Sequence, residues 1–215
     1  MRIKICGITT VEQGIEIARL GATDLGFICV ASSPRYLNLT KLQPLVAVLG
    51  AEANTVGVFA DFSIATIAHV VTLTELNTVQ LHGTESVEFC HQLREALPET
   101  EIIKAWRVRN SSDLELIQAY SEVVDGLLLV AYHPDALGGT GQTLDWQQLA
   151  AFKPPIPWLL AGGLTPDNIL AALSQLDPDG IDLSSGVEVS PGNKDLALVD
   201  RLFTNLRHKP SRGNS

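Results

Sequence analysis

Two short segments near the end of the sequence could bind a phosphate group. Residues 162–164 read Gly-Gly-Leu, and residues 184–186 read Ser-Ser-Gly. Glycines let backbone N–H groups approach an anion closely, and serine hydroxyls add hydrogen-bond donors. A single glycine pair is equally consistent with a tight turn, but two such segments together favour a phosphorylated ligand. The sequence therefore predicts a phosphate site that contains Gly162, Gly163, Ser184, Ser185 and Gly186.

Cys6 could act as a nucleophile or, once ionised, as a base. It ends the run Ile-Lys-Ile-Cys and precedes Gly7. A thiolate at working pH needs a positive neighbourhood. The alternative to a catalytic role is that of a small buried apolar side chain, and we expect this structural role for Cys29 and Cys90. The three cysteines form no Cys-x-x-Cys pair and the five histidines are scattered, so no metal site is predicted.

Arg35, His82 and Gly139 are candidates for contacts with the rest of a ligand. The guanidinium of Arg35 could hold a carboxylate or a phosphate, and His82 could orient a substrate. Gly139 belongs to the run Gly-Gly-Thr-Gly at residues 138–141, which is typical of a hinge in a closing lid. The alternative interpretations are a solvated arginine, a histidine whose hydrogen bonds are satisfied by neighbouring backbone groups, and a merely flexible loop.

All these candidates follow short apolar runs that are typical of β-strands. The runs alternate with segments whose apolar residues recur every three or four positions, as in helices that cover a parallel sheet. The predicted strands are residues 3–5, 25–30, 55–59, 78–81, 102–106, 126–130, 157–161 and 180–183. Helix starts are predicted at Thr40, at Thr84-Glu85 and at Thr165-Pro166-Asp167.

Eight strand–helix units in 215 residues predict a single-domain (β/α)8 TIM barrel of the α/β class. We expect the barrel to occupy residues 1–207 and residues 208–215 to form a disordered tail. The active site of such a barrel lies at the carboxyl ends of its strands, where the candidates above are predicted to gather. An open doubly wound sheet is the alternative, but no Gly-x-Gly-x-x-Gly segment follows the first strand.

Composition excludes several functional classes. The net charge of -9, without a dense basic stripe, argues against nucleic acid as a partner. The longest apolar run, residues 127–132, is far below the roughly 18 residues that a membrane span needs. The first residues have no signal-peptide pattern, so we expect a cytoplasmic protein. No obligatory protein partner is evident.

Seven segments together resemble the phosphoribosylanthranilate isomerases of tryptophan biosynthesis, and several resemble cyanobacterial members. The segments are Lys-Ile-Cys-Gly-Ile-Thr at 4–9, Ser-Pro-Arg-Tyr at 33–36, Val-Gly-Val-Phe at 56–59, Val-Gln-Leu-His-Gly at 79–83, Gly-Gly-Thr-Gly at 138–141, Ala-Gly-Gly-Leu at 161–164 and Asp-Leu-Ser-Ser-Gly-Val-Glu at 182–188. Each is weak alone, but their order and spacing are specific and cover nearly the whole chain.

The resemblance implies an Amadori rearrangement of N-(5'-phosphoribosyl)anthranilate to 1-(2-carboxyphenylamino)-1-deoxyribulose 5-phosphate without a cofactor. It implies that Cys6 is the general base, that Arg35 faces the anthranilate carboxylate and that Asp182 lies near the substrate amine. The residues that match the family's phosphate cradle are Gly163, Ser185 and Gly186.

One position departs from the family pattern. Val130 stands where the resemblance implies the aspartic acid that protonates the ribose ring oxygen. Asp125 is expected about 16 Å away, at the other end of the strand, given ~3.3 Å per residue. Asp135 lies in the predicted lid, where rigid support is lacking. We therefore predict an isomerase impaired by Val130.

Three alternatives stay open at this point. Another acid could replace the one missing at position 130. The chain could be a catalytically silent barrel that binds phosphoribosyl ligands. It could also be a related sugar-phosphate isomerase, such as that of histidine synthesis, although that enzyme typically uses two aspartates and the Cys6 segment argues against it.

Overall fold

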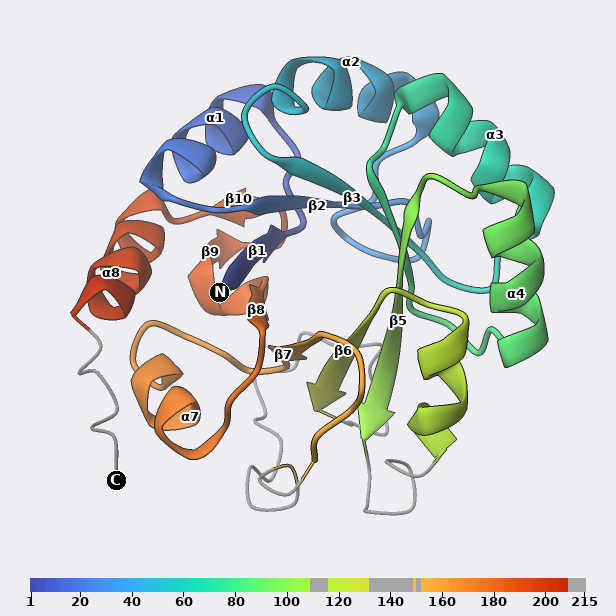
Figure 1. Cartoon of the computed structure of the whole chain (residues 1–215). Helices are drawn as coiled ribbons and strands as arrows, with labels where there is room; N and C mark the ends of the chain where they lie inside the picture. The colour runs from blue at the N-terminus through green and yellow to red at the C-terminus, as the bar shows by residue number, and fades with distance from the viewer. Residues whose placement is uncertain (109–115, 132–148, 150–151, 209–215) are drawn as a thin grey trace.

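The chain folds as a closed barrel of eight parallel strands surrounded by helices (Figure 1). The computed structural model describes residues 1–108, 116–131, 149 and 152–208. The strands follow one another around the barrel in sequence order, and β1 pairs with both β2 and β8 to close it. The strands are β1 (Arg2–Cys6), β2 (Asp24–Ile28), β3 (Asn54–Phe59), β4 (Thr78–Leu81), β5 (Glu101–Val108), β6 (Gly126–Ala131), β7 (Trp158–Ala161) and β8 (Gly180–Leu183). The predicted (β/α)8 class is confirmed, and the predicted strand ends differ from the observed ones by at most two residues.

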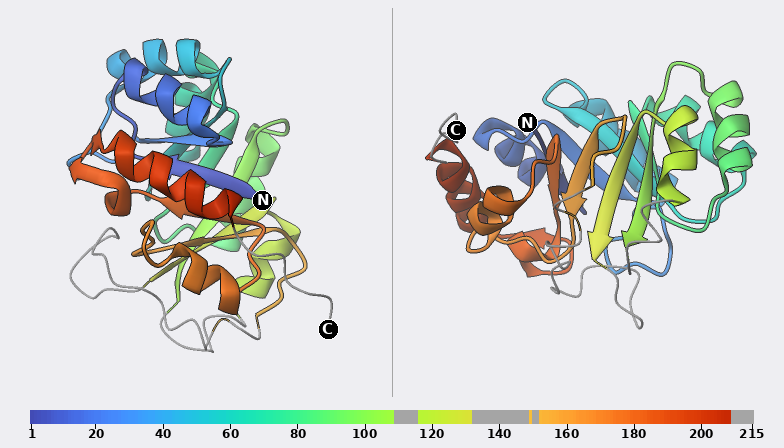
Figure 2. Two further views of the ribbon diagram at one scale, coloured as in Figure 1. Left: turned by 90° about the vertical axis from the view of Figure 1, so that its left-hand side faces the viewer. Right: turned by 60° about the horizontal axis from the view of Figure 1, so that its bottom comes forward.

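The helices pack as a ring outside the strands, as the two turned views show (Figure 2). Neighbouring helices touch in the order α7, α8, α1, α2, α3 and α4. Their bounds are α1 (Val11–Leu20), α2 (Leu39–Leu49), α3 (Ile64–Thr74), α4 (Val87–Ala96), α7 (Ile169–Gln175) and α8 (Leu196–Arg207), with 3-10 turns η1 (Gln118–Glu122) and η2 (Ser185–Val187). A two-stranded hairpin, β9 (Glu188–Ser190) and β10 (Asn193–Lys194), follows η2. In the part of the chain that the structure describes, no helix is both long and apolar enough to cross a bilayer.

Two predicted helix starts are wrong by two residues. Asn38, not Thr40, caps α2, and its side-chain oxygen accepts from the backbone N–H of Lys41 at 3.1 Å. Ser86, not Thr84, caps α4 by accepting from the N–H of Phe89 at 3.1 Å. Each segment offers two polar residues that could cap, and only the one whose oxygen reaches the third N–H of the helix does so.

The predicted start of α7 is also wrong. The helix begins at Ile169, and Asn168 before it makes no side-chain cap bond. Instead, Thr165 and Asn168 bond to each other: the Asn168 side chain accepts from the Thr165 N–H at 2.8 Å, and the Thr165 hydroxyl accepts from the Asn168 N–H at 3.3 Å. Asn168 also donates to the carbonyl of Gly163 at 2.8 Å. This turn therefore links the helix start to one of the glycine segments.

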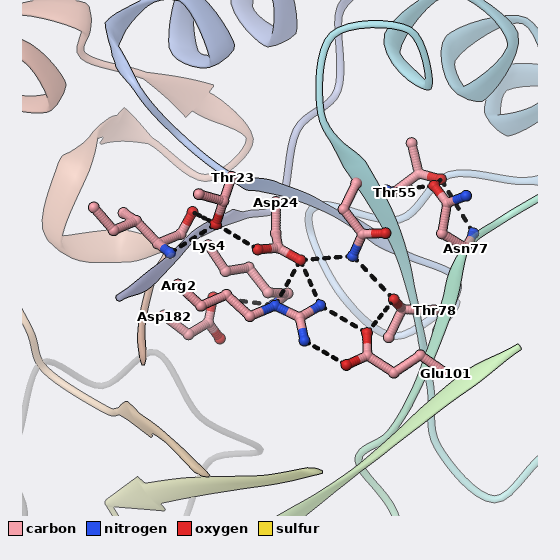
Figure 3. Close-up of polar contacts among 11 residues, drawn as sticks. Arg2, Lys4, Thr23, Asp24, Thr55, Asn77, Thr78, Glu101 and Asp182 are labelled. Atoms are coloured by element: carbon pink, nitrogen blue, oxygen red, sulfur yellow. Dashed lines mark hydrogen bonds and ion pairs between the residues drawn. The ribbon is translucent and has the colours of Figure 1, made fainter. Parts of the chain in front are cut away.

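The amino ends of the strands are closed by a polar network (Figure 3). The guanidinium of Arg2 lies 2.5 Å from carboxylate oxygens of both Asp24 and Glu101. Asn54 donates to Asp24 at 2.6 Å, and Thr78 donates to Glu101 at 2.6 Å. Burial opposes ionisation of Asp24, but its bonds with Arg2, Thr23 and Asn54 lower its pKa overall. This network ties the starts of five strands together at the end opposite to the predicted site.

The inner wall of the barrel differs from one side to the other. Because side chains alternate in and out along barrel strands, residues two apart share a face. On β5, β6 and β7 the inner face is a separate buried apolar cluster of Ile103, Ala105, Leu128, Val130, Leu159 and Ala161. On β1 and β8 the inner face carries Lys4, Cys6 and Asp182. The barrel thus presents an apolar wall opposite a charged one.

Candidate active site

A cavity of about 410 Å³ opens at the carboxyl ends of the strands. It brings together ten of the eleven residues predicted for the site. Those that line it are Cys6, Arg35, His82, Val130, Gly162, Gly163, Asp182, Ser184, Ser185 and Gly186. Gly139 and the predicted lid lie outside the described residues. Among the described residues, no group of histidine, cysteine or acidic side chains could hold a metal ion.

Cys6 lies beside a buried ion pair. The ammonium of Lys4 is 3.0 Å from a carboxylate oxygen of Asp182, and Lys4 is fully buried (Figure 3). Burial raises the pKa of the Cys6 thiol above its ordinary value, Asp182 adds to the rise, and Lys4 and Lys194 oppose it. Burial alone would lower the pKa of Lys4, but Asp182 and Cys6 raise it overall, so Lys4 stays charged. The thiol therefore has two cations that would stabilise its ionised form.

Arg35 lies across the chain just after Cys6. A Cβ added to Gly7, whose φ is +83°, would come within 2.6 Å of the Arg35 side chain, so only glycine leaves room for it. Glu188 accepts from Arg35 Nε at 2.9 Å and from Nη2 at 2.5 Å. This bond with Glu188 raises the pKa of Arg35 and keeps it charged at all working pH values. Glu188 thus fixes the guanidinium of Arg35 at the cavity wall.

The two glycine segments adopt shapes that suit close approach of a ligand. Gly162 and Gly163 have φ values of +93° and +66°, a region that residues with a side chain rarely adopt. A Cβ on Gly186 would collide with the carbonyl oxygen of Leu164. The hydroxyl of Ser184 donates to the Cys6 carbonyl at 3.0 Å, so it is already used within the protein. Backbone N–H groups and the Ser185 hydroxyl are therefore the better donors for an anion.

Gln80 is a cavity residue that the sequence reasoning did not single out. It is 1% exposed, and its Nε2 lies 3.1 Å from Nδ1 of His82. Within the part that the structure describes, its Oε1 is buried without a hydrogen-bond partner. Strand alternation could have found Gln80, because it shares a face with His82 two residues later. A hydroxyl or amine of a bound ligand would satisfy this acceptor.

Val130 forms part of the apolar wall. It is 4% exposed and pairs in register with Arg107 of β5, whose Nε is buried without a hydrogen-bond partner in the described part of the chain. Asp125 lies at the opposite end of β6, where it accepts from the N–H of Ile102 at 2.7 Å. Asp135 lies outside the described residues. Among the described residues that line the cavity, Asp182 is the one carboxylate, and Lys4 already pairs with it.

Comparison with known proteins gives one consistent result. A family model described as "N-(5'phosphoribosyl)anthranilate (PRA) isomerase" matches residues 3–205. The chain is 60% identical to the N-(5'-phosphoribosyl)anthranilate isomerase of Trichormus variabilis, with 96% of this chain and 98% of that one covered. It is 56% identical to the same enzyme of Crocosphaera subtropica, with 96% and 99% covered.

Solved structures agree with these sequence matches. The phosphoribosyl anthranilate isomerase of Thermotoga maritima superposes with a TM-score of 0.87 at 33% identity, over 96% of this chain and 98% of that one. A structure of phosphoribosyl anthranilate isomerase in complex with reduced 1-(o-carboxyphenylamino)-1-deoxyribulose 5-phosphate gives 0.82 at 31% identity, over 96% and 98%. At these identities the likeness covers sequence as well as fold.

Proposed function

Because the chain belongs to the N-(5'-phosphoribosyl)anthranilate isomerase family, we propose that it performs the family's rearrangement slowly, with Val130 in place of the general acid. The family's enzymes are cofactor-independent aldose–ketose isomerases of tryptophan biosynthesis. The observation that carries the proposal is the single cavity in which Cys6, Arg35, Asp182 and both glycine segments meet. Its contents match a substrate with a carboxylate at one end and a phosphate at the other.

Substrate binding follows from the two ends of this cavity. The substrate phosphate would accept from backbone N–H groups of the glycine segments and from the Ser185 hydroxyl. The anthranilate carboxylate would face the guanidinium of Arg35, which suits planar anions. Between these ends, the ribose lies beside Cys6 and Asp182.

The rearrangement needs an acid and then a base. Protonation of the ribose ring oxygen breaks its bond to C1' and leaves a protonated Schiff base. Cys6 then removes the proton from C2', and the electron pair of that C–H bond forms the C1'=C2' double bond as the nitrogen regains its lone pair. Tautomerisation of this enol moves a proton to C1' and yields the ketone. Cys6 can act only as a thiolate, which the nearby Lys4 favours.

The first step lacks its donor in this chain. A valine side chain cannot supply a proton, and the carboxylate of Asp182 is already paired with Lys4 at 3.0 Å. General acid catalysis contributes about 10² to 10⁴ in rate. We infer that ring opening limits turnover, while binding of the open-chain product is intact.

Val130 also favours a second candidate function, a barrel that binds phosphoribosyl ligands without turnover. The apolar wall around Val130 could pack against the aromatic ring of a ligand whether or not the protein catalyses a reaction. The two candidates differ only in whether measurable turnover exists.

The test is turnover of freshly generated N-(5'-phosphoribosyl)anthranilate, followed by the loss of anthranilate-type fluorescence. Calorimetry with reduced 1-(o-carboxyphenylamino)-1-deoxyribulose 5-phosphate measures binding separately. We expect clear binding with weak turnover. Failure to bind this analogue would refute the proposed site, and binding without any turnover would favour the silent barrel.

We also propose that residues 1–207 form the working domain, with residues 208–215 as a tail, and that the protein acts in the cytoplasm. The family model ends at residue 205, which supports this domain boundary. Limited proteolysis followed by mass spectrometry tests this boundary, because the first cleavage should occur near residue 208.

A further inference from the structure

The hairpin β9–β10 contacts the cavity residue Arg35 through Glu188. Its position is fixed by α1: Gln13 donates to Asn193 at 2.8 Å, and its side-chain oxygen accepts from the Lys194 N–H at 3.4 Å. Thr9 donates to the carbonyl of Gly192 at 2.6 Å. Glu188 and Lys194 of this hairpin do not line the cavity. Any effect they have on a ligand must pass through another residue.

Glu188 holds one edge of the Arg35 guanidinium. It accepts from Nε and Nη2, and the structure gives Nη1 no partner among the described residues. This leaves the second edge of the guanidinium for an anion in the cavity. However, a carboxylate so close to Arg35 would by itself cancel the charge that a ligand should meet.

Lys194 removes this difficulty. Its ammonium lies 2.7 Å from Glu188 and 3.2 Å from the Ser184 carbonyl, and its side chain is 0% exposed. Burial lowers the pKa of Lys194, while Glu188 opposes that fall. For Glu188, burial acts to raise the pKa, but Arg35 and Lys194 lower it overall. With Lys194 protonated, as its 2.7 Å contact with the Glu188 carboxylate favours, the group of Arg35, Glu188 and Lys194 carries one net positive charge.

Cys6 faces the same group of charges. Lys194 on β10 donates to the Ser184 carbonyl at 3.2 Å, and the Ser184 hydroxyl donates to the Cys6 carbonyl at 3.0 Å. Lys4 on the same strand and Asp182 on β8 also act on the thiol, and Arg35 with Glu188 lies beyond Gly7. Lys4 and Asp182 offset each other at 3.0 Å. The net positive charge near the thiol thus depends on the hairpin.

We propose that Glu188 and Lys194 are positioning residues of this site: Glu188 fixes Arg35 by one edge, and Lys194 offsets the Glu188 charge so that the site presents net positive charge. This positive charge would stabilise the thiolate of Cys6 and an anionic group of the ligand. The part that concerns the ligand carboxylate rests on the proposed function, whereas the part that concerns Cys6 does not.

The test follows alkylation of Cys6 by iodoacetamide as a function of pH, with the modified peptide quantified by mass spectrometry. Cys29 and Cys90 are internal controls, because burial raises their pKa values to about 12 and about 11. We expect Lys194→Met to raise the midpoint for Cys6 by about one pH unit, the lower end of the effect of one nearby charge. Lys194→Arg keeps the charge and should stay close to the unmodified chain.

The double variant Glu188→Gln/Lys194→Met makes the test specific. It removes both charges and leaves Arg35 unpaired, so the midpoint should return toward that of the unmodified chain. General loosening of the hairpin would instead move the double variant further than Lys194→Met alone. That result, or an unchanged midpoint in Lys194→Met, would overturn the proposal. Thermal unfolding of each variant confirms that it is folded.

Calorimetry separates this inference from the proposed function. Lys194→Met should weaken binding of the carboxylated product analogue about tenfold, and leave binding of its phenyl counterpart without the carboxylate unchanged. Equal losses for both ligands would refute the role toward the carboxylate. If the unmodified chain bound neither ligand, the proposed function would fail, and the alkylation result would still decide the role of Lys194.

Discussion

If ring opening limits turnover as proposed, Val130→Asp should raise kcat while lowering the stability of the barrel. The introduced carboxyl group would face the cavity from β6, in register with Arg107, whose Nε has no hydrogen-bond partner among the described residues. General acid catalysis contributes about 10² to 10⁴ in rate, which corresponds to about 2.7 to 5.4 kcal/mol at 1.36 kcal/mol per factor of ten. We expect kcat to rise within that range.

The same change should destabilise the barrel. Val130 is 4% exposed and packs in the apolar cluster on β5, β6 and β7. Replacing it with a carboxyl group loses apolar contacts and buries a polar one, for which about 1 to 3 kcal/mol is a typical loss. Urea unfolding followed by circular dichroism measures this loss, and fluorescence-detected turnover measures the gain in rate.

Val130→Asn is the matched control, because an amide has the same shape as the carboxyl group but cannot act as an acid. It should lose similar stability and gain no rate. Equal turnover of the unmodified chain and Val130→Asp would show that another group supplies the proton. Equal turnover of Val130→Asn and Val130→Asp would show that polarity, not proton donation, is what Val130 lacks.

Three further changes test other parts of the structure. Cys6→Ser, made in the Val130→Asp background, should lower kcat at least about 100-fold because a hydroxyl is a far weaker base than a thiolate, and near-normal turnover would exclude Cys6 as the base. Gly186→Ala should raise the KM for the phosphorylated substrate about tenfold or more, since its Cβ collides with the Leu164 carbonyl and moves the segment; calorimetry with inorganic phosphate checks this. Asp24 has a lowered pKa through its bond with Arg2, so its contribution to stability is present above about pH 4 and lost as the pH falls below that value. Asp24→Asn should therefore flatten the dependence of the urea midpoint on pH between 5 and 3, and an unchanged slope would contradict this.

The strands were predictable because burial on both faces produces short apolar runs, and glycine or polar residues mark the ends of these runs. The segment at residues 78–81 matches β4, and that at 180–183 matches β8. Helix starts were less predictable because capping depends on which oxygen reaches a free N–H. Asn38 and Thr40 both carry an oxygen that could cap a helix, and only that of Asn38 lies at a free N–H, that of Lys41.

The cavity residues were predictable where a strand end coincided with a polar or glycine residue. Glu188 and Lys194 lie beyond the last barrel strand. The contact of Glu188 with Arg35, and that of Lys194 with Glu188, depend on how the hairpin folds back. Pattern reasoning assigns neither residue a role, because a glutamate and a lysine in a loop are usually solvated. Gln80 is an intermediate case, since alternation identifies its face but not its missing partner.

The ion pair between Lys4 and Asp182 joins residues 178 positions apart in the chain. During synthesis Cys6 emerges well before Asp182 and Lys194. Contacts of such long sequence separation form late in folding, since the loop that they close must be ordered first. A growing chain thus holds Lys4 and Cys6 without Asp182 and Lys194 until β8 joins β1. The site is therefore complete only once the barrel has closed. A truncation that removes β8 removes both Asp182 and the strand that pairs with β1, and activity should be lost with them.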